Sequence, residues 1–154
     1  QSKGLTPATT YILASIVEEE SNAVDEKDTI ASVYMNRFRK GMRLQADPTV
    51  KFALKEFTLK RIYEKHLLVE SPYNTYRNTG FPPGPICTPS LETINAVLQM
   101  PSTNYLYFVA KSDFSGRHVF SETYEEHLIK AKEFQKAQDE QQKIKAAREA
   151  KEKN

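Results

Sequence analysis

The sequence predicts an α+β fold with a mainly helical core, and three patterns lead to this prediction. Apolar residues recur at helical spacing through residue 39, two short aromatic and β-branched runs near residue 110 are typical of a hairpin, and a charged helical pattern ends the chain. With 154 residues and 39% hydrophobic content, the chain is long enough for one compact domain with a core.

The first helix is predicted at residues 7–21. Thr6 and Pro7 are typical of an N-cap followed by proline at the first helical position. The residues from Tyr11 to Val17 are apolar on nearly all sides, which predicts a helix buried on most of its surface.

Two further helices are predicted at residues 25–39 and from Asp47 to about Leu54. Gly41 is expected to end the longer one, whose core stripe comprises Ile30, Val33, Tyr34 and Phe38. Residues 57–70 fit neither the helical nor the strand period.

Residues 71–90, SPYNTYRNTGFPPGPICTPS, are rich in proline, glycine and aromatic side chains. Proline and glycine prevent regular structure here, and the aromatic residues argue against simple disorder. An ordered loop of this length inside a compact domain is more often functional than not.

After this loop we expect a helix at residues 90–100 and an antiparallel hairpin of strands at 103–111 and 115–121. A last helix starts with Thr123 capping toward Glu126 and is expected to bury Leu128, Ile129 and Phe134. We therefore divide the chain into a domain of residues 1–134 and a charged, solvated helical extension of residues 135–154.

The composition excludes several classes of protein. A net charge of +2 lacks the basic excess typical of nucleic-acid binding. The single cysteine, Cys87, excludes an internal disulfide and a cysteine metal cluster. No apolar run is long enough to span a bilayer, so this piece is expected to be soluble. Its start at Gln1 rather than methionine indicates processing or excision from a longer protein.

Three consecutive glutamates, Glu18, Glu19 and Glu20, end the first predicted helix. Successive helical residues project about 100° apart, so only one of them can face a given cleft. A carboxyl turned toward the apolar interior beside charged neighbours has a raised pKa, as a general acid requires. The alternative is a solvated helix end, although the helix dipole disfavours acidic residues there.

The other reactive side chains suggest no second chemistry. Structural or hydrogen-bonding roles are expected for His66, His118 and His127, because their spacing fits no metal site. Cys87 is interpreted as a packing residue rather than a nucleophile, and no nucleophile elbow supports a serine triad. Neither a metal nor a cofactor is predicted.

Polar and aromatic residues gather around the predicted loops. Sugars are recognised by such a mixture of aromatic faces and planar polar groups. The alternative is that these side chains only brace turns and pair with neighbours. They are Asn36, Arg37, Gln45, Asp47, Tyr73, Asn74, Thr75 and Tyr76.

Over nearly the whole predicted domain of residues 1–134, the chain resembles the catalytic domain of the MltG (YceG-like) endolytic murein transglycosylases. Five long segments carry the resemblance in the family's order: LASIVEEES (13–21), IASVYMNRFRKGMRLQADPTV (30–50), SPYNTYRNTGFPPGPICTP (71–89), NYLYFVAK (104–111) and HVFSETYEEH (118–127). Residues 51–70 depart from the family pattern.

The resemblance implies a lysozyme-like helical core and cleavage of the β-1,4 bond between N-acetylmuramic acid and N-acetylglucosamine within peptidoglycan strands, without water, leaving 1,6-anhydro ends. Glu20 matches the family's catalytic acid, and Glu18 matches the other glutamate of the motif. Residues expected at the substrate are Glu18, Asn36, Arg37, Gln45, Asp47, Tyr73, Asn74, Thr75, Tyr76 and Phe120.

The resemblance also implies a setting. Full-length family members carry an amino-terminal membrane helix and a LysM-like region, and the helix would hold this domain at the periplasmic face of the inner membrane. The charged extension has no counterpart in this resemblance, and recruitment of other cell-wall enzymes by it is a further possibility that can coexist with catalysis. Two alternatives stay open: a hydrolytic muramidase in which Asp47 positions a water, and a module that binds peptidoglycan without cleaving it.

Overall fold

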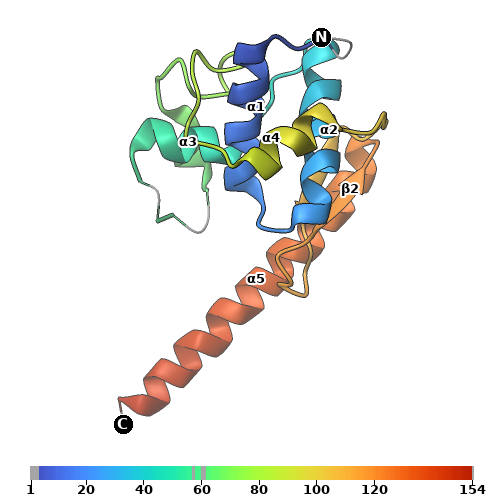
Figure 1. The fold of residues 1–154 in the computed structure, drawn as a ribbon. Coiled ribbons are helices and arrows are strands. Elements are labelled where there is room, and N and C mark those ends of the chain that lie inside the picture. Colours follow the sequence, from blue (N-terminus) through green and yellow to red (C-terminus); the bar gives the residue numbers. More distant parts are fainter. Residues whose placement is uncertain (1–3, 57, 60–61, 154) are drawn as a thin grey trace. The chain divides into compact units, whose positions relative to one another are not determined.

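The computed structural model describes residues 4–56, 58–59 and 62–153. It divides the chain into two units, residues 1–104 and 105–154. The first unit holds four α-helices among its described residues, and the second holds a two-stranded hairpin and one long helix (Figure 1). The predicted α+β fold, with a small hairpin and a long C-terminal helix, is confirmed.

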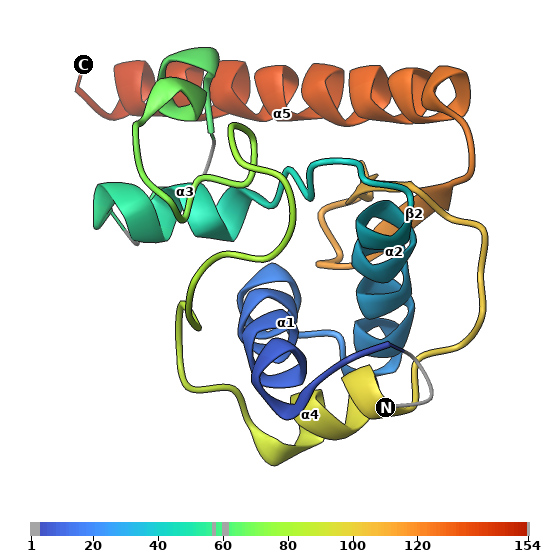
Figure 2. The ribbon, with the colours of Figure 1, turned by 90° about the horizontal axis from the view of Figure 1, so that it is seen from above.

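Three helices enclose the core of the first unit. Helix α4 (Leu91–Leu98) packs against both α1 (Pro7–Glu20) and α2 (Lys27–Arg39), as Figure 2 shows. The burial predicted for α1 is confirmed except at Tyr11, which is exposed. Fully buried side chains of the unit include Leu13, Ile16, Val17, Ile30 and Met35.

The ends of α1 follow from local hydrogen bonds. The backbone N–H of Thr9 donates to Thr6 Oγ1 at 3.1 Å, and the Thr6 N–H donates to Thr9 Oγ1 at 2.8 Å, which confirms the predicted N-cap. The helix ends at Glu20 with Ser21 as its C-cap, one residue earlier than predicted.

Helix α2 begins at Lys27 after a 3₁₀ turn at Val24–Glu26, two residues later than predicted. It ends as predicted near Gly41, whose φ of 72° is the left-handed conformation that glycine adopts at no steric cost. The N–H groups of Gly41 and Met42 bond the carbonyls of Phe38 and Arg37. The prediction that Phe38 belongs to the core is wrong. Phe38 is 38% exposed and stacks on Phe81.

Helix α3 (Asp47–Leu54) has the predicted bounds and packs against α1. In the segment that fitted neither period, a short 3₁₀ helix, η2, spans Glu64–Leu68. Residues 57, 60 and 61 of that segment lie outside the described residues.

Residues 71–90 contain neither helix nor strand and are nevertheless tightly held, as predicted. Asn74 is completely buried and its Nδ2 donates to the carbonyls of Leu67 and Val69 at 3.0 and 2.8 Å. The loop packs so closely that a Cβ atom on Gly84 would lie 2.9 Å from Tyr73 Oη. A side chain at this position would displace the Tyr73 hydroxyl, so glycine allows the loop and Tyr73 to pack closely.

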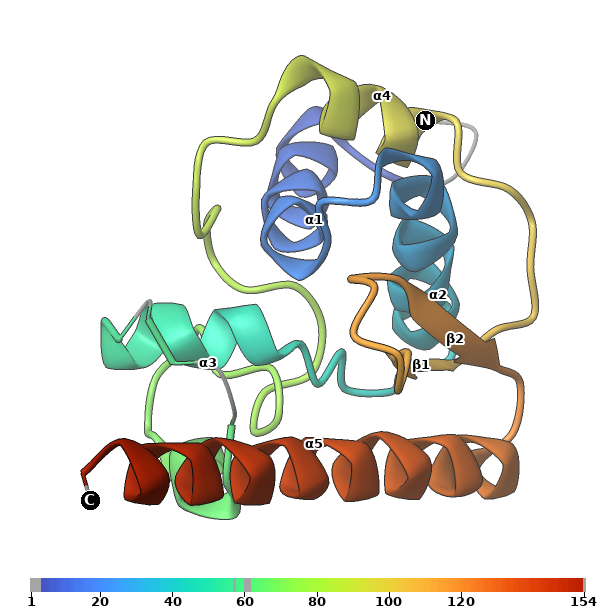
Figure 3. The ribbon, with the colours of Figure 1, turned by 90° about the horizontal axis from the view of Figure 1, so that it is seen from below.

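The second unit consists of strands β1 (Tyr107–Ala110) and β2 (His118–Ser121), paired antiparallel, and helix α5 (Tyr124–Glu152), which packs against both (Figure 3). The strands are shorter than predicted, because only four residue pairs face each other in register, from Tyr107–Ser121 to Ala110–His118. The Glu126 N–H donates to Thr123 Oγ1, as the predicted cap requires.

Helix α5 is half-buried only along its beginning. Phe134 contacts Phe114 with ring centroids 5.9 Å apart, whereas Ile129 is 63% exposed and its predicted burial is wrong. The predicted division between residues 134 and 135 falls inside this continuous helix, so a separate role for residues 135–154 stays a prediction.

Candidate active site

The last turn of α1 directs its glutamates to different surroundings. Glu18 and Glu20 are two residues apart and therefore project about 200° apart around the helix. Both are half-buried, whereas Glu19 between them is exposed. The two half-buried carboxyls have opposite electrostatic environments.

Burial first, and then the negative charge of Asp47, raise the pKa of Glu20 from 4.5 to about 8. A hydrogen bond with the Tyr34 side chain and the positive charge of Lys51 act in the opposite direction and are outweighed. Glu20 is therefore mostly protonated at neutral pH, the state in which a carboxyl can donate a proton to a leaving group.

Asp47 is the first residue of α3 and accepts a hydrogen bond from Tyr76 Oη. Its carboxyl keeps exposed surface, yet the protein atoms around it desolvate it enough to raise its pKa. The Tyr76 hydrogen bond and Lys51 lower that pKa and so favour the ionised form. Burial and the Asp47 charge also raise the pKa of Tyr76, which keeps its hydroxyl a donor.

The loop that carries Tyr76 is attached to the start of α3 by buried bonds. Thr75 Oγ1 accepts from the Ala46 N–H at 2.8 Å and bonds Thr49 Oγ1 at 2.9 Å. The Gln45 N–H donates to the Thr75 carbonyl at 3.3 Å. Gln45, two residues before Asp47, has a φ of 51°, an uncommon conformation for a residue other than glycine.

Two of the predicted polar residues brace the backbone. Arg37 is buried, and its Nη1 donates to the Arg43 carbonyl at 2.7 Å and to Gln45 Oε1 at 3.5 Å. Asn36 Nδ2 donates to the carbonyl of Thr103 at 2.9 Å. The bracing alternative therefore describes the contacts of both, and substrate binding by them stays a prediction.

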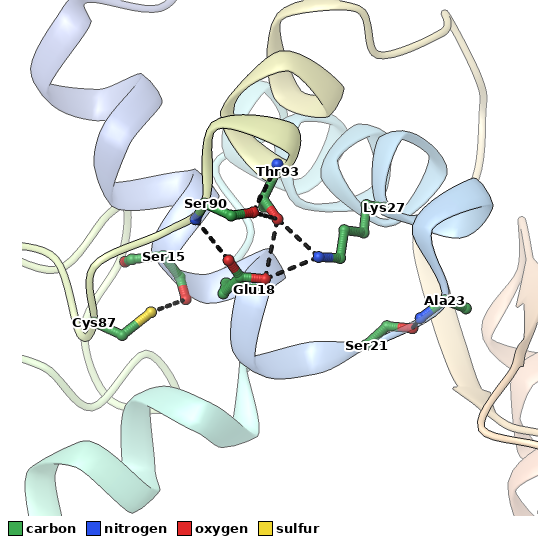
Figure 4. Close-up of polar contacts among 8 residues, drawn as sticks. All are labelled: Ser15, Glu18, Ser21, Ala23, Lys27, Cys87, Ser90 and Thr93. Carbon is green, nitrogen blue, oxygen red and sulfur yellow. Dashed lines mark hydrogen bonds and ion pairs between the residues drawn. The ribbon is translucent and has the colours of Figure 1, made fainter.

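The Glu18 carboxylate accepts three hydrogen bonds, one from each of three residues (Figure 4). Lys27 Nζ lies 2.8 Å from Oε2, which Thr93 Oγ1 also reaches at 3.0 Å, and the Ser90 N–H donates to Oε1 at 2.6 Å. Lys27 Nζ bonds Thr93 Oγ1 as well, at 2.8 Å. We call Glu18, Lys27, Ser90 and Thr93 the Glu18 clamp.

The clamp keeps Glu18 ionised. Burial alone would raise the pKa of Glu18, but hydrogen bonds from Lys27, Ser90 and Thr93 outweigh it and lower the pKa to about 2. Both carboxyl oxygens of Glu18 accept hydrogen bonds from protein groups. The substrate contact predicted for Glu18 is untested and stays a prediction.

Cys87 lies beside the clamp, and its Sγ donates to the Ser15 carbonyl at 3.2 Å (Figure 4). Burial raises the pKa of the Cys87 thiol to about 12, helped by the negative charge of Glu19. The thiolate is not populated at neutral pH, in agreement with a packing role.

A model of the YceG-like family matches residues 1–133. The chain belongs to the YceG-like family. It is 46% identical over 121 residues to an endolytic murein transglycosylase of Bacillus subtilis, covering 79% of this chain and 32% of that protein. An endolytic murein transglycosylase of Streptococcus pneumoniae strain D39 is 31% identical over 131 residues, covering 82% of this chain and 24% of that protein.

A crystal structure of a YceG-like protein from Listeria monocytogenes superposes with a TM-score of 0.75 at 41% identity, covering 82% of this chain and 40% of that chain. The chain thus spans about a quarter to two fifths of the relatives it matches. Within the described residues of this YceG-like chain, no helix has the length and apolar content needed to cross a membrane.

The structure brings together several of the predicted site residues of the YceG-like chain. Glu20, Asp47 and Tyr76 influence one another's pKa. The hydrogen bond between Gln45 and Thr75 joins the segment that carries Asp47 to the loop that carries Tyr76. Phe120 lies on β2 in the second unit, where it contacts Tyr105 and Phe108, and its predicted place at the substrate is untested.

Sequence reasoning missed Tyr34 and three members of the clamp. Tyr34 was assigned to the core stripe of α2, and its burial is confirmed, but its hydroxyl also reaches Glu20. One feature of the sequence could have indicated this contact: a tyrosine in an apolar stripe is expected to be buried, and a buried hydroxyl needs a hydrogen-bond partner. No signal in the sequence marks Lys27, Ser90 or Thr93, because their partner is 9 to 75 residues away.

Proposed function

We propose that this chain is the catalytic domain of a peptidoglycan lytic transglycosylase, in which Glu20 acts as both general acid and general base. The main support is the half-buried carboxyl of Glu20, whose pKa is raised to about 8. It lies near Asp47 at the start of α3, which is hydrogen-bonded by Tyr76 from the loop. Relatives named endolytic murein transglycosylase support the substrate and the reaction class.

The reaction requires one carboxyl that changes its protonation state twice. Protonated Glu20 gives its proton to the glycosidic oxygen as the bond from the muramic acid C1 to that oxygen breaks. The muramic acid 6-hydroxyl then bonds C1 and returns its proton to Glu20. No water enters, and a 1,6-anhydro end forms, so a second catalytic carboxylate is not needed as it is in ordinary glycosidases.

Asp47 is proposed to serve this reaction in two ways. Its negative charge opposes ionisation of Glu20 before bond cleavage, and it favours positive charge on the sugar ring during cleavage. Tyr76 holds the Asp47 carboxyl by its hydrogen bond. Tyr73 and Tyr76 are proposed to contact sugar rings, and Gln45, Asn74 and Thr75 to shape the loop around them.

Hydrolysis is the second candidate, because a second carboxylate is present. If Asp47 activated a water, Glu20 and Asp47 would form the pair typical of muramidases. The products differ by one water molecule, which mass spectrometry of the digest resolves. A reducing, hydrated muramic acid end would establish hydrolysis in place of the transglycosylase reaction.

The deciding experiment digests purified sacculi with wild type and with Glu20→Gln. We expect wild type to release anhydro-ended fragments and Glu20→Gln to lose activity by at least about a thousandfold while keeping its fold and glycan binding, because the amide cannot donate the proton. Glu19→Gln is the matched control, since Glu19 is the exposed neighbour, and it should retain activity.

Three outcomes would overturn the proposal. Substantial anhydro product from folded Glu20→Gln would remove Glu20 from the mechanism. Loss of activity in Glu19→Gln as well would indicate a general charge effect. Sacculus binding by wild type with no product of either kind would favour a non-catalytic binding module.

We further propose that the protein acts in the cell envelope, on the periplasmic face of the inner membrane, because peptidoglycan lies there. The charged part of α5, exposed from residue 139 to 153, is proposed to bind other cell-wall enzymes. Fractionation of cells and co-purification with and without residues 139–153 test these two statements.

A further inference from the structure

The Glu18 clamp joins the ends of three helices. Glu18 belongs to the last turn of α1, Lys27 is the first residue of α2, and Ser90 and Thr93 are the N-cap and first turn of α4 (Figure 4). Thr93 is completely buried and Lys27 nearly so. One carboxylate therefore ties together segments that are far apart in the sequence.

The charge of Glu18 is unfavourable for its own helix and favourable for α4. The last turn of α1 contains acidic residues and no basic residue, where the helix dipole disfavours negative charge. The same carboxylate accepts the N–H of Ser90 at the N-terminus of α4, where negative charge is favoured. The contacts to α4 and Lys27 thus hold a helix end that would otherwise tend to fray.

A second attachment lies one turn earlier on the same face of α1. Ser15 Oγ accepts the N–H of Ile86 at 3.1 Å, and Cys87 Sγ donates to the Ser15 carbonyl at 3.2 Å. Ser15 and Glu18 are three residues apart and share a face. The chain from Ile86 to Ser90 is therefore fastened along two successive turns, which fixes the rotation of α1 about its axis.

This rotation sets the direction of Glu20. Glu20 projects from the opposite side of the same turn, toward Asp47 and Tyr34. A helix that turned about its axis by roughly 20° would move a carboxyl at its surface by on the order of 1–2 Å. A displacement of that size in a reacting group lowers rates strongly.

From this geometry we infer that Glu18 is a positioning residue: through Lys27, Ser90 and Thr93 it holds the last turn of α1 in the one rotation that presents Glu20 to the substrate. The inference rests on the proposed role of Glu20 as the reacting acid. In this role Glu18 acts through the position of Glu20, whether or not it also contacts the sugar.

The first test changes the centre of the clamp by one atom type. Thr93→Val keeps the shape of the side chain and removes the hydroxyl that bonds both Glu18 and Lys27, whereas Thr93→Ser keeps the hydroxyl. We expect kcat of Thr93→Val on glycan strands to fall about tenfold or more with little change in KM. Thr93→Ser should retain most of wild-type kcat, and Glu18→Gln should resemble Thr93→Val.

A stability control separates positioning from general loosening of the fold. Val97→Ala removes a fully buried side chain from α4 and leaves all four clamp residues in place. Its kcat per folded molecule should equal that of wild type. Positioning is overturned if folded Thr93→Val and Glu18→Gln keep wild-type kcat, or if Val97→Ala loses kcat to the same extent.

A second readout does not depend on activity. Carbon-13 NMR of glutamate carboxyls, with Glu20 assigned by its loss in Glu20→Gln, reports the pKa of Glu20 directly. In wild type we expect a value near 8, and in Thr93→Val and Glu18→Gln a value moved toward 4.5, as Glu20 turns toward solvent.

The two proposals fail in different ways. If wild type releases no anhydro product and the Glu20 titration still moves in the variants, the proposed function is wrong and positioning of this carboxyl is supported. If anhydro product forms and neither the titration nor kcat changes in the variants, the proposed function stands and positioning is overturned.

Discussion

Glu18 and Glu20 lie two residues apart on α1, and the surrounding protein shifts their pKa values in opposite directions, to about 2 and about 8. The Glu18 region surrounds its carboxylate with an ammonium group, a hydroxyl and a backbone N–H at the start of a helix. The Glu20 region offers burial, a tyrosine hydrogen bond and a neighbouring carboxylate.

The difference shows that partial burial alone does not decide the charge of a carboxyl. Burial is the largest single influence on both pKa values, and it raises both. Donors that bond the charged form reverse its effect at Glu18, whereas the Asp47 charge reinforces it at Glu20. One face of a helical turn thus serves stability, and the other is suited to proton transfer.

The largest effect that tests this comparison is the pH dependence of stability caused by Glu20. Its pKa is raised in the folded state, so its contribution to stability is fully present below pH 4.5 and is lost as the pH rises through 8. Across that interval we expect wild type to lose about 3–5 kcal/mol in free energy of unfolding relative to Glu20→Gln, which stays neutral. Urea denaturation at a series of pH values measures this, and parallel curves would contradict it.

The lysines beside the two glutamates provide a matched pair. Lys27→Met leaves the Glu18 carboxylate without its counter-ion, and we expect a loss of about 2–3 kcal/mol of stability. This is below the roughly 3–5 kcal/mol usual for a fully buried pair, because 23% of the Glu18 side chain is exposed to screening solvent. Lys51→Met should change stability at pH 7 by less than about 0.5 kcal/mol and raise the pKa of Glu20. Equal losses of stability in the two variants would erase the distinction.

Acid should reveal the opposite behaviour of Glu18. Its pKa is lowered in the folded state, so its contribution is present above pH 4.5 and is lost as the pH falls through 2. After allowance for solvent screening we expect about 1–2 kcal/mol to disappear in this interval for wild type, and less for Glu18→Gln. Thermal unfolding of both proteins between pH 5 and pH 2 tests whether wild type loses more stability on acidification than Glu18→Gln does.

The smallest expected effects concern the partners of Glu20. Asp47→Asn removes the charge that raises the pKa of Glu20, so the fall of kcat with rising pH should begin at lower pH, with roughly a threefold to tenfold loss at pH 7. Tyr76→Phe removes the bond that lowers the pKa of Asp47 and should shift the profile less, in the same direction. A profile that moves toward higher pH in Asp47→Asn would contradict the electrostatic account.

Much of the fold could be predicted from local patterns. Thr6–Pro7 located the start of α1, Gly41 the end of α2, and Pro48 the start of α3, because caps and proline positions depend on neighbouring residues alone. Asp47 was expected to cap α3 and is instead its first residue, after an N-cap at Ala46 that makes no side-chain bond. Strand lengths and the exposure of Phe38 and Ile129 were predicted less well. They depend on which partner lies opposite, and periodicity does not contain that information.

By itself, the sequence determined that three acidic side chains end a buried helix and that Glu18 and Glu20 face opposite ways, since helix geometry requires it. Only the tertiary structure decided which of them became ionised and which protonated. Lys27, Ser90 and Thr93 approach one side, and Tyr34, Asp47 and Tyr76 approach the other, from distant parts of the chain. The charge of a carboxyl depends on the groups within a few ångströms of it, and packing alone brings those groups there.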